Sequence, residues 1–439
     1  MVMNYHVTMI KHLMTEKVGG RMDKLLHTPE GVRDIYNSEC TKKMQLEQAM
    51  RERMHLYGFH DIQTPMFEFF DIFNQERGTV ASKDMYKFFD REGNTLVLRP
   101  DITPSIARCV AKYYRFEGMP IRLCYCGSTF INNSSYQGKL KECTQLGAEL
   151  VNDASVEADA EMIALTVECL KEAGLEEFLV EIGQADFFAG LMEEAALEEE
   201  EVLQLRILIE QKNMFGVEEL LEGKKIEPSL KQIILQLPEL FGTIDKIKAI
   251  HDTLKNERAK NALQRLEQLY DLLCCYGYEK YITFDLGMLS KFNYYTGIIF
   301  RAMTYGTGDA IITGGRYDSL VGQFGKNAPA IGMAVLVDSL LVALSRQKLD
   351  KEVIADHTLI LYQSKARPMA IGLAKHFRQE GMKIELMTYQ EETAISEYVE
   401  YARRSGIGGI LHLKNETQVD VIQAEDGLIQ HADLSQLMQ

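Results

Sequence analysis

The sequence contains no run of about 18 consecutive apolar residues, so it predicts no transmembrane helix. Positive charge is also scarce: 48 Lys and Arg residues stand against 64 Asp and Glu residues among 439, a formal net charge of −16. Surfaces that bind nucleic acid are usually basic, so this balance argues against a nucleic-acid partner. We find no internal repeat and no low-complexity tract.

Cysteine is too sparse for a disulfide scaffold. The eight cysteines in a chain of this length indicate reduced thiols and a cytoplasmic protein. Two pairs stand close in sequence, Cys124 with Cys126 and Cys274 with Cys275, and neither has a second pair at zinc-ligand spacing. Ordinary packing is the favoured interpretation of both pairs, with a metal or redox role as the alternative. We expect no metal and no cofactor.

What is present is an ordinary globular composition, with 46% hydrophobic and 26% charged residues. The length predicts two or three domains. Residues 1–20 lack the apolar core of a signal peptide and end at two glycines, so they predict a disordered leader or a start codon placed too early. Residues 21–345 then form the main domain, and a polar linker at 346–356 follows it.

Two parts of the chain have their own pattern. Residues 188–273 are rich in Leu and Glu and predict a helical insertion, in which the acidic run 198–201 is a solvated helix face. Residues 357–439 predict a small α/β domain, because strand patterns at 357–362, 383–388 and 407–413 alternate with helix patterns. Residues 356–439 contain eight Lys and Arg and twelve Asp and Glu, or 8 − 12 = −4.

One predicted strand carries polar side chains at alternate positions. Residues 144–151 place Gln145, Gly147 and Glu149 on one face and apolar residues on the other. The glycine leaves room between an amide and a carboxylate. The pattern alone favours a solvated face, with a polar pocket as the alternative.

Several segments, taken in order, resemble those of class II aminoacyl-tRNA synthetases, and of histidyl-tRNA synthetase in particular. The segment 59–65 resembles motif 1, and 329–334 resembles the start of motif 3. Between them stand four segments similar to the histidine pocket of that enzyme: LRPDIT at 98–103, CTQLGAE at 143–149, NYYTG at 293–297 and GGRYD at 314–318.

The resemblance implies an α+β fold. The expected domain has a six- to seven-stranded antiparallel sheet with flanking helices, and it associates with a second copy through the motif 1 region. The residues 357–439 resemble an anticodon-binding domain in architecture only. An anticodon-reading surface is expected to be basic, and these residues are acidic overall.

The resemblance also implies a histidine site. Asp101, Thr103, Gln145 and Glu149 would contact the ammonium side of the ligand, which moves the interpretation of strand 144–151 towards a pocket. Carboxylates and amides are suitable acceptors for an ammonium group. The remaining positions of the implied site are Tyr294 and Tyr295 around the imidazole, Gly314 and Gly315 where the backbone approaches the ligand, and Arg316. For the two tyrosines, packing within the sheet is the alternative interpretation.

Three arginines of the synthetase pattern are missing. Amino-acid activation builds negative charge on phosphate oxygens, and guanidinium groups stabilise that charge. The motif 2 arginine and glutamate positions hold Ile131 and Asn133, and the other two arginine positions hold Ser290 and Ser339. Losing one preorganised donor typically costs about 10²–10³ in rate, so the loss of three predicts no adenylation.

Neighbouring cations do not replace these arginines. Lys291 directly follows Ser290, but in an extended segment it is expected to point to the opposite face. Lys139 and Arg316 cannot fill all three roles. The branch of this family that the sequence resembles is that of the regulatory subunits of ATP phosphoribosyltransferase. That resemblance implies a short catalytic subunit as partner, a hetero-octamer, and L-histidine as inhibitor. A divergent histidyl-tRNA synthetase, or another tRNA-handling paralogue, is the alternative.

Overall fold

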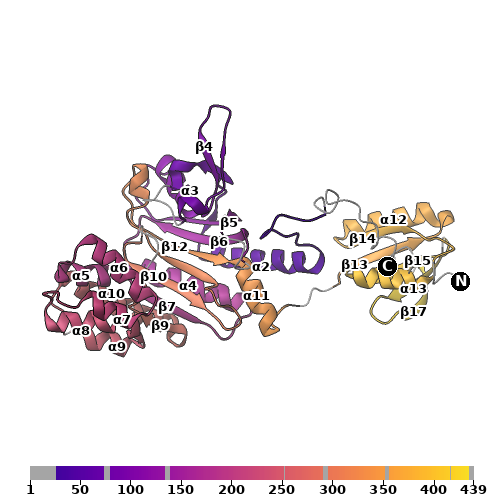
Figure 1. Cartoon of the computed structure of the whole chain (residues 1–439). Coiled ribbons are helices and arrows are strands. Elements are labelled where there is room, and N and C mark those ends of the chain that lie inside the picture. The colour runs from indigo at the N-terminus through magenta and orange to yellow at the C-terminus, as the bar shows by residue number, and fades with distance from the viewer. Residues whose placement is uncertain are drawn as a thin grey trace, which may run out of the picture. The chain divides into compact units, whose positions relative to one another are not determined.

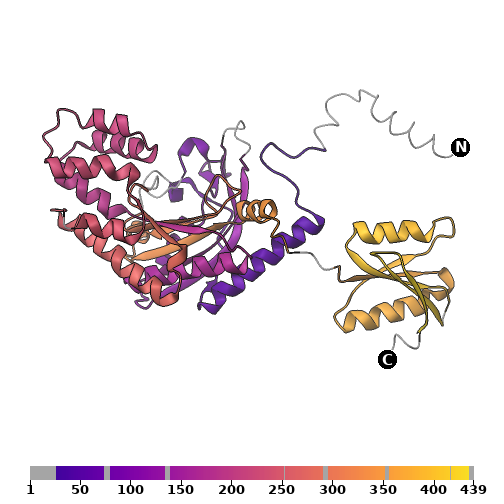
Figure 2. The ribbon, with the colours of Figure 1, turned by 90° about the horizontal axis from the view of Figure 1, so that it is seen from below.

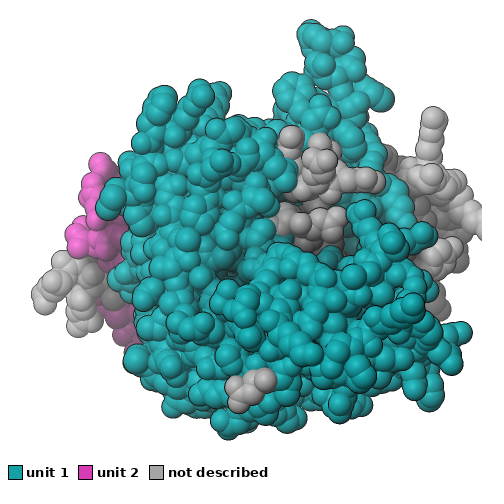
Figure 3. All heavy atoms as spheres, turned by 90° about the vertical axis from the view of Figure 1, so that its left-hand side faces the viewer, with its two compact units in different colours: residues 1–34, 46–349 teal, residues 35–45, 350–439 magenta. Residues whose placement is uncertain are grey.

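The computed structural model describes residues 26–73, 80–133, 139–251, 253–289, 295–351, 355–415 and 417–434. The leader predicted for 1–20 lies outside them. The chain divides into two compact units, coloured separately in Figure 3: residues 1–34 with 46–349, and residues 35–45 with 350–439. Every helix within the described ranges is too short or too polar to span a membrane.

The first unit is built on a nine-stranded sheet. Across the sheet the strands are β1 (His60–Asp61), β5 (Ile121–Phe130), β6 (Glu142–Val151), β12 (Ala330–Leu336), β11 (Ile312–Arg316), β10 (Ile298–Met303), β7 (Leu179–Gln184), β9 (Ile282–Asp285) and β8 (Phe241–Gly242). The pairs β1–β5 and β7–β9 are parallel and the others are antiparallel. The sheet exceeds the expected six or seven strands because two-residue strands extend both edges. The segment 59–65, which resembles motif 1, pairs with β5 only over His60–Asp61.

Helices cover both faces of this sheet, with α3 (Thr103–Tyr113) above it and α4 (Val156–Glu172) below it in Figure 1. The alternation of β6 explains this arrangement. Leu146, Ala148 and Leu150 belong to the apolar core formed with α4 and with α2 (Asn37–Leu56), whereas α3 packs in a separate cluster on the opposite face. Each face of β6 is thus covered.

A small sheet stands beside α3. It contains β2 (Phe67–Phe69), β4 (Thr95–Leu98) and β3 (Lys87–Phe89), in that order. Strand β4 leads directly into the loop before α3, so this sheet sets the position from which α3 begins. The short segments η2 (Phe70–Phe73) and η3 (Ser82–Asp84) connect β2 to β3 around the gap in the described residues.

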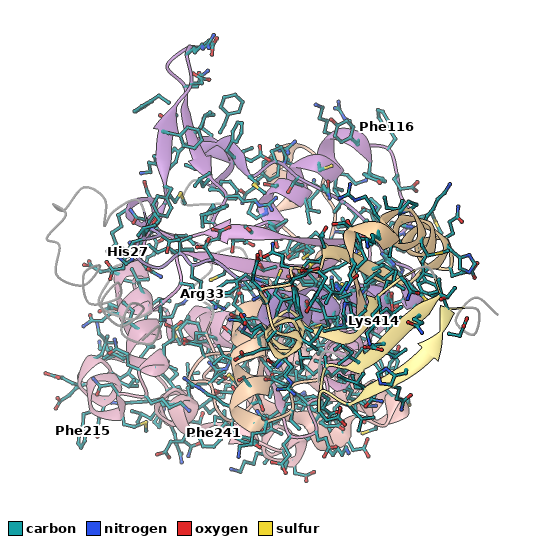
Figure 4. The ribbon with its side chains drawn as sticks, turned by 90° about the vertical axis from the view of Figure 1, so that its right-hand side faces the viewer. His27, Arg33, Phe116, Phe215, Phe241 and Lys414 are labelled. Atoms are coloured by element: carbon teal, nitrogen blue, oxygen red, sulfur yellow. The ribbon has the colours of Figure 1, made fainter. Side chains whose placement is uncertain are left out.

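Six helices lie between β7 and β9 within the described residues: α5 (Ala185–Ala195), α6 (Glu199–Glu210), α7 (Met214–Leu220), α8 (Pro228–Gln236), α9 (Ile244–His251) and α10 (Glu257–Tyr276). The acidic run 198–201 begins α6, where Glu198 and Glu201 form a reciprocal capping box. Negative charge in a first turn stabilises a helix, so this run has a local role. Figure 4 shows Phe215 of α7 and Phe241 of β8 pointing outward, and their exposed fractions are 86% and 49%.

The second unit contains the predicted alternation of strands and helices. Strands β13 (His357–Tyr362), β14 (Lys383–Thr388) and β15 (Ile407–Leu413) have the predicted bounds, and α12 (Arg367–Gln379) and α13 (Ile395–Arg404) connect them. Two antiparallel strands that were not predicted, β16 (Gln418–Gln423) and β17 (Ile429–Asp433), complete the order β14-β13-β15-β16-β17. Figure 2 shows a helix on each face of this sheet.

Candidate functional site

A cavity of about 670 Å³ opens in the first unit, between β6, β11, β12, the start of α3 and helix α11 (Val337–Gln347). Seven of the nine residues expected to bind histidine line it. Tyr294 lies outside the described residues, and Arg316 does not line the cavity. The seven are Asp101, Thr103, Gln145, Glu149, Tyr295, Gly314 and Gly315.

Glu149 is the buried acid of this cavity, with an exposed fraction of 1%. The Thr103 hydroxyl donates to its Oε1 at 2.7 Å, and the Tyr317 hydroxyl donates to its Oε2 at 2.5 Å. Burial raises the pKa of Glu149 to about 8, against the opposite effect of these two hydrogen bonds. The polar face of β6 therefore lines a pocket, and the interpretation that the alternation alone favoured, a solvated face, is wrong.

Two further acceptors converge on the same space. Asp101 Oδ1 accepts from the backbone N–H groups of Ile102 and Thr103, at 2.7 and 3.4 Å, which fixes the carboxylate at the start of α3. Gln145 Oε1 is buried without a hydrogen-bond partner among the described residues. A buried acceptor without a donor is costly, so this amide is suited to a ligand N–H group. The cavity offers two carboxylates and an amide to an ammonium-bearing ligand.

Glycines make room for the side chains of this site. A Cβ on Gly315 would lie 2.7 Å from the Tyr295 ring, so this glycine makes room for the tyrosine. The predicted approach of the Gly314 and Gly315 backbone to a ligand stays a prediction. The sequence analysis did not identify Gly332 or Tyr317. A Cβ on Gly332 would lie 1.7 Å from Glu149 Oε2. The sequence could have indicated Tyr317, because residues two apart in an extended chain lie on the same face and Tyr317 follows Gly315 by two residues.

The Gly332→Ala substitution is expected to displace the Glu149 carboxylate. The added methyl group overlaps the carboxylate oxygen, so the side chain or β12 must move. We expect a loss of about 1–3 kcal/mol in the free energy of unfolding, typical of overpacking, and about tenfold weaker histidine binding. Denaturant melts and calorimetric titration measure these effects. Gly308→Ala, also in the cavity lining but with open space around its Cβ, should change neither quantity.

Arg316 has a structural position, so its predicted contact with the ligand is corrected. Its exposed fraction is 3%, and its guanidinium donates to Asp159 Oδ1 through Nε at 2.9 Å and Nη2 at 2.5 Å. It also donates to the carbonyl oxygens of Asp153 and Ser155. The alternation of β11 explains the error, because Arg316 shares its strand face with Gly314, opposite to Gly315 and Tyr317.

The Arg316→Lys substitution tests this correction. Lysine keeps the charge but cannot make the paired contact with Asp159, so we expect a loss of about 1–2 kcal/mol in the free energy of unfolding. Histidine affinity should remain within about twofold of the native value because the side chain is outside the cavity. A large loss of affinity with unchanged stability would instead indicate a ligand contact.

Two of the three positions of the missing arginines, and the position of the missing glutamate, belong to this cavity. Ile131, Asn133 and Ser339 line it, and Ser290 and Lys291 lie outside the described residues. Two cationic residues contribute to the lining. Lys139 Nζ lies 3.7 Å from Asp309, and Arg346 Nη1 donates to the Gly306 carbonyl at 2.5 Å.

The sequence analysis did not identify Arg346 as a residue of the cavity. Its position on α11 is distant from Ser339, which occupies the place of a missing arginine. The two residues share a helix face but are seven residues apart, which is about 10 Å along the axis. Four acidic residues share the lining with these two cations: Asp101, Glu149, Asp309 and Asp338, of which Glu149, with its pKa raised to about 8, is protonated at neutral pH. The electrostatic character of the described lining favours a cation over a polyphosphate.

Comparisons with known proteins find relatives that match most of this chain. A family model described as histidyl-tRNA synthetase matches residues 31–340. Proteins named ATP phosphoribosyltransferase regulatory subunit are similar over most of the chain. The one from Acetivibrio thermocellus is 40% identical over 94% of this chain and 98% of its own length, and the one from Ruminiclostridium cellulolyticum is 38% identical with the same coverage.

Two solved structures have the same fold. One, from Bacillus halodurans, is titled ATP phosphoribosyltransferase regulatory subunit/histidyl-tRNA synthetase; it is 30% identical, with a TM-score of 0.78 over 89% of this chain and 98% of that chain. The histidyl-tRNA synthetase of Nostoc has a TM-score of 0.77 over 94% of this chain and 98% of that chain. At 20% identity, this second likeness shows the fold alone.

Proposed function

This chain belongs to the family of ATP phosphoribosyltransferase regulatory subunits, which has the histidyl-tRNA synthetase fold, and we propose that its cavity binds free L-histidine as a feedback signal. The observation that carries the proposal is the set of convergent acceptors, Asp101, Gln145 and Glu149, in one cavity. A histidine ammonium group needs such acceptors. The acidic excess of the lining supports a cationic ligand.

The same cavity supports a loss of synthetase chemistry. Adenylation needs fixed cations around the α-phosphate. Ile131 and Ser339 supply none, and the cations that do line the cavity, Lys139 and Arg346, already contact a carboxylate and a carbonyl. A bound amino acid would therefore remain unactivated. The alternative function, a divergent histidyl-tRNA synthetase, requires these two cations to carry the reaction.

The partner follows from the family. The name of the relatives implies a catalytic ATP phosphoribosyltransferase subunit, and we propose that this chain activates a short form of that enzyme within a hetero-octamer. Histidine that binds one state of the assembly more tightly shifts the whole assembly, with a typical coupling of about 1–3 kcal/mol. Self-association through the motif 1 region, 59–65, and a cytoplasmic location belong to the same proposal.

A reconstitution experiment tests the proposal. Mixed with the short catalytic subunit, the chain should raise phosphoribosyltransferase activity, and histidine should then inhibit it. Histidine alone should raise the melting temperature of the chain, because a ligand that binds only the folded state stabilises that state. Incubation with histidine, ATP and labelled pyrophosphate should give no exchange. Exchange above background would favour the synthetase, and no activation together with no thermal shift would refute the proposal.

A further inference from the structure

Three metal-ligating side chains meet outside the cavity, at the edge of the main sheet. His55 lies in the last turn of α2, Asp61 in β1 and Cys124 in β5. Asp61 and Cys124 are direct partners in the parallel β1–β5 pair, so their side chains share a face. Spacing along the sequence does not indicate this cluster, because its three members come from three elements.

The distances within the cluster suit one ion. His55 Nε2 lies 3.1 Å from Asp61 Oδ2, and Cys124 Sγ lies 3.5 Å from Asp61 Oδ1. One ligand atom from each residue can be chosen so that all three lie within 4.8 Å of one another. Zinc bonds of about 2.0–2.3 Å in a tetrahedron place neighbouring ligand atoms roughly 3.3–3.6 Å apart. Small side-chain rotations therefore suffice to surround an ion.

We propose that His55, Asp61 and Cys124 form a zinc site, with its fourth position occupied by water. A set of nitrogen, oxygen and sulfur ligands is typical of zinc, whereas calcium and magnesium take oxygen ligands. The Cys124 thiol donates to Asp61 when no ion is bound. As the zinc–sulfur bond forms, the thiol proton leaves to solvent, and the ion's two charges are balanced by one thiolate and one carboxylate.

The surroundings of the cluster support the proposal. Arg51 Nε donates to Asp61 Oδ1 at 2.6 Å, which orients the carboxylate and leaves Oδ2 towards His55. Hydrogen bonds of this kind commonly hold metal-bound carboxylates. Cys124 packs in the core with Met50 and Met54 of α2. The His55 side chain is 42% exposed in the single chain, so an ion in solvent reaches the cluster past His55. The ion would fasten the end of α2 to the edge strand.

Cobalt binding to the chelator-treated full chain tests the site, because a cobalt–thiolate bond gives a charge-transfer band. We expect one equivalent of Co²⁺, a band that zinc abolishes, and a zinc dissociation constant of about 1 µM or tighter. Cys124→Ser should lose the band and His55→Ala should weaken zinc binding at least about tenfold. Since His55 is exposed, its replacement leaves folding intact.

Cys126→Ser is the matched control, since Cys126 lies two residues along β5 on the same strand face and should keep the band. Three outcomes would overturn the proposal: no band, a band that persists in Cys124→Ser, or a band lost equally in Cys126→Ser. Circular dichroism of each variant confirms its fold. The result is independent of histidine binding, because none of the three proposed ligands lines the cavity.

Discussion

Replacing Glu149 with alanine is expected to raise the histidine concentration for half-inhibition of the reconstituted phosphoribosyltransferase by about 100-fold. The carboxylate is buried at the floor of the cavity, where the Thr103 and Tyr317 hydroxyls hold it in place. A hydrogen bond to a charged group contributes about 1.5–3 kcal/mol, and alanine removes it entirely. Inhibition curves at several histidine concentrations measure the shift.

The same substitution should leave subunit assembly intact, because Glu149 lines the cavity and its exposed fraction is only 1%. Size-exclusion chromatography with light scattering checks the assembly. Asp309→Ala is the matched control: Asp309 lines the same cavity, but its side chain is 72% exposed, so inhibition should change less than about threefold. Unchanged inhibition in Glu149→Ala would show that feedback histidine binds elsewhere. A broken assembly would show that the residue supports the subunit contact.

Strand β6 shows how far a sequence pattern reaches. Its alternation correctly separated Leu146, Ala148 and Leu150 from Gln145 and Glu149, because a strand's side chains alternate between faces whatever surrounds it. Whether the polar face meets water depends on what covers it. The covering groups, Thr103 and Tyr317, come from segments far along the chain. The local pattern therefore left two interpretations, and the resemblance supplied the reason to prefer the pocket.

The roles of Arg316 and Gly332 could not be predicted from the sequence pattern. A motif identifies which residues stand together but not which face each one occupies, so Arg316 was assigned to the ligand although it binds Asp159. Gly332 leaves room for the carboxylate oxygen of Glu149 on the neighbouring strand β6. Contacts between strands depend on register, which a single sequence does not specify. The fold class was predictable because it depends on several ordered motifs, whereas the edge strands β1 and β8 have only two residues each and carry little pattern.

Histidine affinity is expected to rise with pH, by nearly tenfold per unit well below pH 8 and by progressively less as pH 8 is approached. Burial raises the pKa of Glu149 to about 8, so the empty site holds a proton below that pH. The ammonium group of histidine needs the ionised carboxylate, and binding must therefore expel the proton. Each unit of pH below 8 adds to that cost, and the dependence ends once Glu149 is ionised. Calorimetric titrations in buffers of different ionisation enthalpy measure both the affinity and the proton released.

Glu149→Gln separates this effect from other titrations. The amide cannot ionise, so the variant should bind histidine more weakly than the native chain at pH 8. Its histidine affinity should be nearly constant between about pH 6.5 and pH 8. The neighbouring groups Asp101, Tyr125 and Tyr317 face the same carboxyl and remain in the variant, so any slope due to them persists. Asp309→Asn, which changes an exposed acid of the same cavity, should keep the native slope. If native affinity instead fell as the pH rose, the protonated acid would be the binding form, with Glu149 donating a hydrogen bond to the imidazole nitrogen.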